Sequence, residues 1–238
     1  MKRILEHFHP CSRLNRKREQ YVKQTTMPAH IKALVQTPRL EATQFAQDAN
    51  YIVLDLETTG LDSEEDLILS IGWVDIANGK VDLATSQHMY INSDSQIKPE
   101  TAVINHITPQ MLSEGVSIHD AMRAFFHAAK GKILVAHACV VETQFINQYL
   151  QRVFKLSEPP LVWLDTMCIE KHLQKAINPR DEIDVTLSGT RARYGLPEYN
   201  GHNALADAVA TAELLLAQKT RITPQGKTTI GTLYRLSL

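Results

Sequence analysis

The sequence contains little cysteine and no long apolar run. Its three cysteines, Cys11, Cys139 and Cys168, are odd in number and form no CxxC pair, which argues against a disulfide framework and a zinc cluster. No stretch reaches the roughly 18 consecutive apolar residues of a membrane span, and the first residues lack the apolar segment of a secretory signal. These absences predict a cytoplasmic protein with reduced thiols.

The sequence also lacks a large excess of either charge, but its charges are unevenly distributed. The net charge is −1, whereas residues 1–40 hold nine basic and two acidic side chains, a net charge of +7 that leaves −8 for the rest. A basic arm of this kind is compatible with binding to a polyanion. It is equally compatible with packing on the acidic body of the same chain or, in a homodimer, on a second copy.

Length and composition predict one core domain with an appendage. The chain has 238 residues, of which 44% are hydrophobic and 21% charged, as in an ordinary globular protein. Residues 1–47 have the spacing of short helices broken at Pro28 and Pro38, and form the predicted N-terminal helical extension. Residues 48–218 form the predicted core domain, and residues 219–238 form a tail without an informative pattern.

Within the core, three strands come first, and helices and strands then alternate. This order predicts an α/β sheet covered by helices. The expected strands lie at residues 51–57, 67–76, 81–92, 132–137 and 159–166, and the expected helices at 117–130, 140–154 and 202–218. The last helix places Leu205, Val209, Ala212 and Leu216 on one apolar stripe.

Two acidic residues occupy alternate positions of the first strand. Asp55 and Glu57 would project from one face, while Leu54 and Leu56 turn into the core. Neighbouring carboxylates on a mostly buried strand repel each other unless a cation neutralises them, and hard divalent ions prefer oxygen ligands. The pair therefore indicates a metal site, with two solvated acids at a strand end as the alternative.

A second group of polar residues surrounds the start of the last helix. Asp207 lies among alanines and leucines, where an unpaired carboxylate is costly. His202 precedes it by five residues and is suited to proton abstraction from water near neutral pH. A capping or surface histidine is the alternative interpretation of His202.

A third segment runs from a strand end into a helix. It contains His137 and places Glu142 in the first turn of the helix, where a carboxylate is also favoured by the helix dipole alone. Asp165 follows the next strand and precedes Thr166, a position that a helix N-cap explains.

Together the three segments resemble one family. The order D-x-E-T-T-G-L, then A-H-x₄-acid, then H-N-A-x-x-D is similar to the DnaQ-like DEDDh 3′–5′ exonucleases, over about residues 50–218. The resemblance implies a ribonuclease H-like fold with a mixed five-stranded sheet. It also implies two Mg²⁺ or Mn²⁺ ions per site and hydrolysis from the 3′ end of a nucleic-acid strand, which releases nucleoside 5′-monophosphates.

The resemblance assigns roles to ten residues. It implies His202 as the general base, and four acidic metal ligands, Asp55, Glu57, Asp207 and Glu142. Glu142 departs from the family, which has Asp there, and the Asn and Phe of the same family motif are also missing. The residues assigned to the substrate are Thr58, Thr59, Gly60, Leu61 and His137, with Leu61 as a wedge against the last base.

The sequence leaves the substrate open between single-stranded DNA, which we favour, and short RNA, because contacts to the 2′-hydroxyl distinguish the two. A weakly active module that only binds nucleic acid is a further alternative, suggested by Glu142. The tail shows no sliding-clamp or polymerase-tethering motif, which favours a free-standing enzyme.

Overall fold

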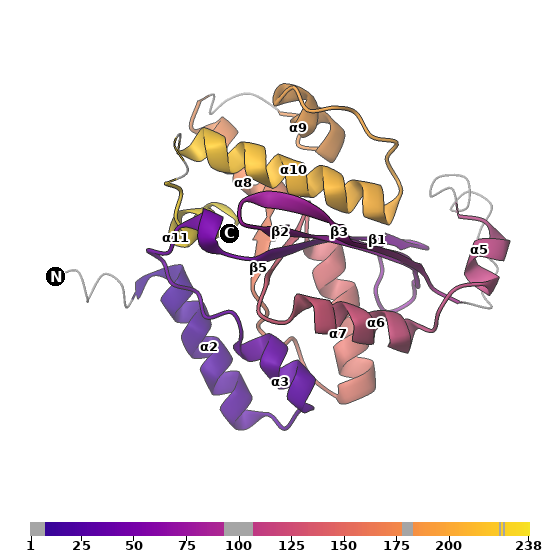
Figure 1. Cartoon of the computed structure of the whole chain (residues 1–238). Helices are drawn as coiled ribbons and strands as arrows, with labels where there is room; N and C mark the ends of the chain where they lie inside the picture. The colour runs from indigo at the N-terminus through magenta and orange to yellow at the C-terminus, as the bar shows by residue number, and fades with distance from the viewer. Residues whose placement is uncertain (1–7, 93–106, 178–182, 224, 226) are drawn as a thin grey trace.

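A computed structural model describes residues 8–92, 107–177, 183–223, 225 and 227–238 of the chain (Figure 1). Lys2 and Arg3, which contribute to the charge of the arm, lie outside the described residues. Five strands form one sheet in the order β3-β2-β1-β4-β5. They are β1 (Tyr51–Thr58), β2 (Ile68–Ala77), β3 (Lys80–Tyr90), β4 (Ile133–Ala136) and β5 (Trp163–Asp165).

The sheet is mixed, as the family resemblance implied. β1 pairs antiparallel with β2 and β2 antiparallel with β3, whereas β4 runs parallel to both β1 and β5. Asn78 and Gly79 turn the chain between β2 and β3 with positive φ angles of 52° and 71°, as a tight hairpin requires. β5 is shorter than expected, because only Trp163–Asp165 pair with β4 and the prolines before them donate no backbone hydrogen bond.

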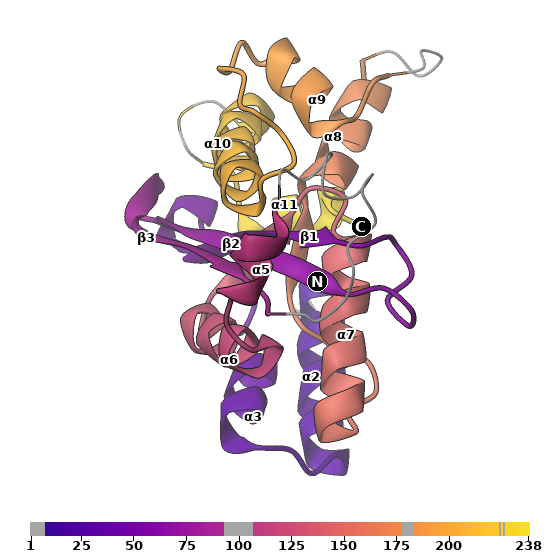
Figure 2. The ribbon, with the colours of Figure 1, turned by 90° about the vertical axis from the view of Figure 1, so that its right-hand side faces the viewer.

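Helices cover both faces of the sheet (Figures 1 and 2). One face packs against α3 (Ala29–Gln36), α6 (Ile118–Ala129) and α7 (Val140–Phe154), and the opposite face against α8 (Thr166–Lys175), α10 (Ala204–Ile222) and α11 (Ile230–Leu236). The other helical elements are α2 (Pro10–Gln24), the 3₁₀ turn η1 (Ala46–Asp48), α5 (Pro109–Ser113) and α9 (Leu187–Arg193). Within the described residues, no helix has both the length and the hydropathy needed to cross a bilayer.

The alternation of side chains along β1 divides the core in two. Ile52, Leu54 and Leu56 pack with α3, α6 and α7, whereas Tyr51 and Val53 pack with α8, α10 and α11. Positions 55 and 57 continue the second face beyond Val53. The acidic pair therefore stands at the end of an apolar row that faces α10.

Helix α10 has a capped N-terminus and packs one face against the sheet. Asn203 is its N-cap, and its side chain accepts a hydrogen bond from the amide of Ala206. Of the predicted stripe of Leu205, Val209, Ala212 and Leu216, Ala212 is buried, and Val209 and Leu216 are half-buried against the same core. The buried face also contains Ala204, Ala208, Thr211 and Leu215, and its small residues let the helix lie close to the sheet.

The N-terminal arm shares both cores with the rest of the chain. Ile31, Leu34 and Val35 of α3 are buried in the core that contains α6 and α7. Cys11 of α2 is buried with Leu233 of α11, on the other side of the sheet. The arm and the C-terminal tail thus complete the two layers around the sheet.

A buried arginine ties the two arm helices together. Arg18 of α2 is 3% exposed, and its guanidinium donates to the backbone carbonyls of Leu34, Val35 and Pro38 at the end of α3. Arg39 forms ion pairs with Glu19 and Glu41. Part of the positive charge of the arm is therefore used within the protein.

Candidate active site

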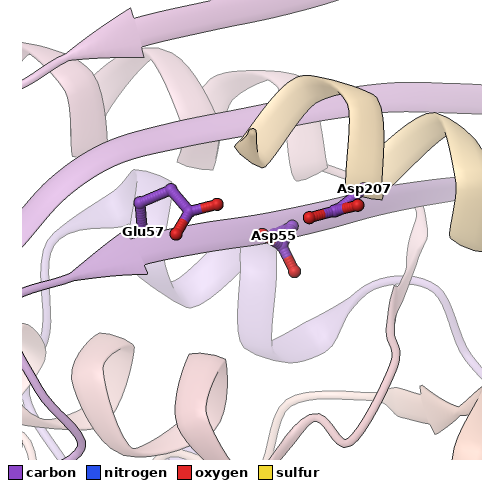
Figure 3. A group of neighbouring side chains, drawn as sticks. All are labelled: Asp55, Glu57 and Asp207. Carbon is purple, nitrogen blue, oxygen red and sulfur yellow. The ribbon is translucent and has the colours of Figure 1, made fainter. Parts of the chain in front are cut away.

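Three carboxylates meet at the C-terminal end of β1, two from β1 itself and one from α10. Asp55 and Glu57 project from β1, and Asp207 projects toward them from the first turn of α10 (Figure 3). One oxygen from each of the three lies within 4.8 Å of the others. The structure therefore brings together acidic residues that are 150 positions apart in the sequence.

A glycine lets α10 approach the strands this closely. Gly72 of β2 lies opposite Asp55 in the antiparallel pair. A Cβ atom at position 72 would overlap the backbone of Ala204 and Leu205. The first turn of α10 therefore rests directly on β2, and Asp207 reaches Asp55 for this reason.

His202 lies in the turn that leads into α10. Its φ of 62° is in the left-handed region, and its backbone amide donates to Oδ2 of Asp207 at 2.9 Å. The carboxylate of Asp207 thus fixes the turn that carries His202. The histidine side chain is exposed, as proton exchange with solvent requires.

Glu142 reaches the site from the other side of β1. Glu142 is the third residue of α7. β1 pairs with β4 only as far as Val53, which leaves the backbone amide of Leu56 free to donate to the carboxylate of Glu142. Glu142 is 4% exposed, and its Oε2 has no hydrogen-bond partner among the described residues. It lies outside the three-carboxylate group found in the described part of the chain.

Asp165 holds the chain segment that leads into α7. Its carboxylate caps α8 by accepting from the amides of Met167 and Cys168 at 2.8 and 3.2 Å. The same carboxylate accepts from the amides of Ala138 and Cys139 at 3.0 and 3.1 Å. Asp165 is the predicted N-cap, and it also fixes the start of the helix that carries Glu142.

Both ring nitrogens of His137 are used inside the protein. Nε2 donates to the carbonyl of Val185 at 2.8 Å, which leaves Nδ1 to accept from the hydroxyl of Thr166 at 2.8 Å. Burial lowers the pKa of His137, consistent with this neutral form. Any contact of His137 with a substrate would therefore come from its ring carbons.

The loop after β1 is held by Asp66. Its carboxylate accepts from the Thr59 hydroxyl at 2.7 Å and from the amide of Asp62 at 3.0 Å. The Thr58 hydroxyl donates to the carbonyl of Gly60 at 2.6 Å. Leu61 stands at the tip of this loop with 74% of its surface exposed, a position open to a substrate base.

All ten residues singled out in the sequence line one cavity of about 460 Å³. They are Asp55, Glu57, Thr58, Thr59, Gly60, Leu61, His137, Glu142, His202 and Asp207. A cavity of this size is ample for one nucleotide.

The carboxylates of this cavity resist ionisation. Burial raises the pKa of Glu57 to about 7, helped by Asp207, and raises the pKa of Glu142 to about 8. Burial and three neighbouring acids, Glu142, Asp207 and Glu57, raise the pKa of Asp55 well above its usual range. The clustered oxygens of Asp55, Glu57 and Asp207 fit a hard divalent cation, which would restore their charged form. Outside this cluster, the buried Oε2 of Glu142 lacks a hydrogen-bond partner among the described residues and is a further candidate ligand.

Sequence reasoning missed Gly72, Asp66 and Glu170. Glu170 is fully buried on α8 and accepts from the Tyr194 hydroxyl at 2.8 Å and from Gln218 at 3.3 Å, next to Arg193 and Arg221. It joins α8, α9 and α10. A buried charge with partners on three helices leaves no periodic signal in the sequence, and a glycine in a strand signals close approach only in general terms.

Comparison with known proteins identifies the family. The family model described as "Exonuclease" matches residues 52–215. The chain belongs to this family. The match includes Asp55 and Glu57 of β1, Glu142 of α7, and His202 and Asp207 at the start of α10.

The curated relatives are much longer than this chain. The chain is 32% identical over 170 residues to "DNA polymerase III PolC-type" of Thermotoga maritima, a match that covers 71% of this chain and 12% of the relative. It is 29% identical over 188 residues to "3′-5′ exonuclease DinG" of Staphylococcus haemolyticus, which covers 79% and 20% of the two chains. The chain thus spans a small part of these relatives.

Solved exonuclease structures share the fold. E. coli Exonuclease I in complex with a dT13 oligonucleotide superposes with a TM-score of 0.61 at 19% identity, over 73% of this chain and 41% of that chain. Exonuclease X in complex with 5′ overhanging duplex DNA superposes with a TM-score of 0.58 at 24% identity, over 79% and 99% of the two chains. The ribonuclease H-like fold predicted from the sequence is confirmed.

Proposed function

We propose that this protein is a divalent-metal-dependent exonuclease that removes nucleoside 5′-monophosphates from the 3′ end of single-stranded DNA. The observation that carries the proposal is the cluster of Asp55, Glu57 and Asp207 within 4.8 Å, in a cavity that His202 also lines. Membership of the exonuclease family supports the reaction class. The oligonucleotide and overhanging DNA bound by Exonuclease I and Exonuclease X support the choice of DNA.

The proposed ligands are Asp55, Glu57 and Asp207, with Glu142 as the fourth. Two Mg²⁺ or Mn²⁺ ions held there would activate the attacking water and stabilise the leaving 3′ oxygen. Glu142 lines the same cavity, and its buried Oε2 has no hydrogen-bond partner among the described residues, so the longer side chain can still offer an oxygen to a cation.

His202 is the proposed general base. Its turn is held by the hydrogen bond to Asp207, so the exposed ring stands beside the acidic cluster, where it can accept a proton from water and pass it to solvent. On the other side, the exposed Leu61 and the loop of residues 58–61 would hold the terminal nucleotide.

A nuclease assay on a 5′-labelled single strand tests the proposal. With Mg²⁺ or Mn²⁺, the wild-type protein should shorten the strand from its 3′ end in single-nucleotide steps, and a chelator should stop it. Asp55→Asn removes a charge but little volume, so it should stay folded and lose activity. Activity of Asp55→Asn close to that of wild type would contradict the metal site.

The same assay tests two alternatives, an enzyme for short RNA and a module that only binds nucleic acid. Matched DNA and RNA oligomers distinguish a deoxyribonuclease from an enzyme for short RNA. Binding without cleavage in either metal would instead support a nucleic-acid-binding module, the role that the Asp-to-Glu difference at position 142 suggests.

A further inference from the structure

A second cavity adjoins the proposed active site on the side away from the loop of residues 58–61. It has a volume of about 630 Å³ and lies between α9 and the segment that leads to His202. It shares His202 and Asp207 with the first cavity and contains none of the loop residues 58–61. The two cavities therefore meet at the proposed reaction centre.

One aromatic side chain stands exposed in the second cavity. Tyr199 lines it with 42% of its surface accessible. Its hydroxyl donates to Oε1 of Glu213 at 3.0 Å, and the Arg191 guanidinium lies 4.8 Å from the ring centroid. The ring is therefore held at its hydroxyl and on one face.

The support behind Tyr199 is itself rigid. Arg191 is 4% exposed and donates to the carbonyl of Pro197 and to Oε2 of Glu213, both at 2.8 Å, and also to the carbonyl of Ala210. These bonds join α9, the segment before His202 and α10. A ring fixed in this way loses little conformational freedom when a flat group stacks on it.

We infer that Tyr199 is the stacking platform for the nucleotide on the 5′ side of the cleaved phosphodiester. The inference rests on the proposed function, because the terminal nucleotide must occupy the loop side of the acidic cluster. The remaining strand then leaves across His202 and Asp207 into the second cavity. Every base has a flat face, so such a contact is independent of sequence.

Two substrates isolate this contact. A single-stranded oligothymidylate extends into the second cavity, whereas the methyl ester of thymidine 5′-monophosphate contains the terminal nucleotide and the scissile phosphodiester but no preceding nucleotide and no flat leaving group. Tyr199→Ala should raise KM for the oligomer about 5- to 150-fold, the range of a lost base stack. Its kcat/KM for the small ester should stay within about twofold of wild type.

Conservative variants and a binding measurement separate stacking from a structural role. Tyr199→Phe keeps the ring and loses only the hydrogen bond to Glu213, so it should behave as wild type. Phe45→Ala removes a similarly exposed aromatic side chain, 45% accessible, that is far along the chain from this cavity. It should change neither KM for the oligomer nor kcat/KM for the small ester. In the Asp55→Asn background, Tyr199→Ala should weaken oligomer binding by a similar factor.

The outcomes distinguish the inference from the proposed function. Equal loss on both substrates, equal damage by Phe and Ala at position 199, or unchanged oligomer binding would overturn the stacking role. If the wild-type protein cleaves neither substrate, the proposed function is wrong, and the effect of Tyr199→Ala on oligomer binding still decides whether the ring contacts the strand.

Discussion

Gly72 lies directly beneath the backbone of Ala204, so that strand β2 and the first turn of α10 touch without a side chain between them. Asp55 stands opposite Gly72 on β1, and Asp207 is three residues beyond Ala204. The spacing of the acidic cluster is therefore set by the absence of a side chain at position 72.

Gly72→Ala should push α10 away from the sheet. We expect the free energy of unfolding to fall by about 1–3 kcal/mol, as in other overpacked interiors, and activity to fall about 100-fold, because a shift of about 1 Å misplaces Asp207. Chemical denaturation and the nuclease assay measure the two effects. Gly201→Ala is the matched control, since a Cβ atom there meets nothing within 4 Å; equal behaviour of the two variants would contradict this account.

The positions of the acidic residues could be predicted from the sequence to the extent that they follow local periodicity. Alternation along β1 placed Asp55 and Glu57 on one face, and the helix signals placed Glu142 in a first turn and Asp207 inside the last helix. The contacts between elements could not be predicted in this way. Asp165 spans 27 residues to reach Ala138, and the buried face of α10 depends on which small residues meet the sheet.

His202→Ala should lower kcat by about 10²- to 10⁴-fold, the usual contribution of a general base. The hydrogen bond from His202 to Asp207 comes from the backbone amide, which the substitution retains, so the metal ligands should stay in place. Mn²⁺ binding by calorimetry and strand affinity should therefore match wild type. If the His202→Ala variant cleaves at the wild-type rate at neutral pH, His202 is a surface residue without a catalytic role.

Glu142→Gln and Glu142→Asp should behave differently. Gln keeps the length of the side chain but removes its negative charge. The buried Oε2 of Glu142, which has no hydrogen-bond partner among the described residues, would otherwise offer that charge to a cation, so activity should be severely reduced. Asp keeps the charge and restores the residue type of the family, so activity should be retained or increased. A fully active Gln variant would show that Asp55, Glu57 and Asp207 suffice.

The metal-free protein should lose stability as the pH rises. The folded-state pKa values of Glu57 and Glu142, about 7 and about 8, exceed the usual value of a glutamate, about 4.3. The folded state therefore binds more protons than the unfolded state between about pH 4 and 8, and the free energy of unfolding decreases across this window. Thermal melts in a chelator should show a falling Tm from pH 5 to 9.

Divalent metal should oppose this loss. Mg²⁺ or Mn²⁺ binds the deprotonated carboxylates, so the increase in Tm on adding metal should grow with pH. Glu57→Gln should flatten the pH dependence of the metal-free protein. A Tm that rises with pH in the chelator, or a slope unchanged by Glu57→Gln, would contradict the raised pKa values.

Deletion of residues 1–40 should destabilise the protein whatever the arm binds. It removes Ile31, Leu34 and Val35 from one core and Cys11 from the other, and it exposes the surfaces on which they pack. The Tm of the deleted protein should fall well below that of the full chain. A deletion alone therefore cannot test whether the arm contacts nucleic acid.

Charge neutralisation provides that test. Lys17, Lys23 and Lys32 are exposed on α2 and α3, so their replacement by Gln should leave the Tm unchanged. If all three contact phosphates of a single strand, the slope of log affinity against log salt should decrease by about 2, at ~0.7 for each contact. Arg18→Gln is the contrasting variant, because it should lower the Tm through the carbonyls of α3 without a specific effect on the salt slope. An unchanged slope in the triple variant would assign the arm a structural role only.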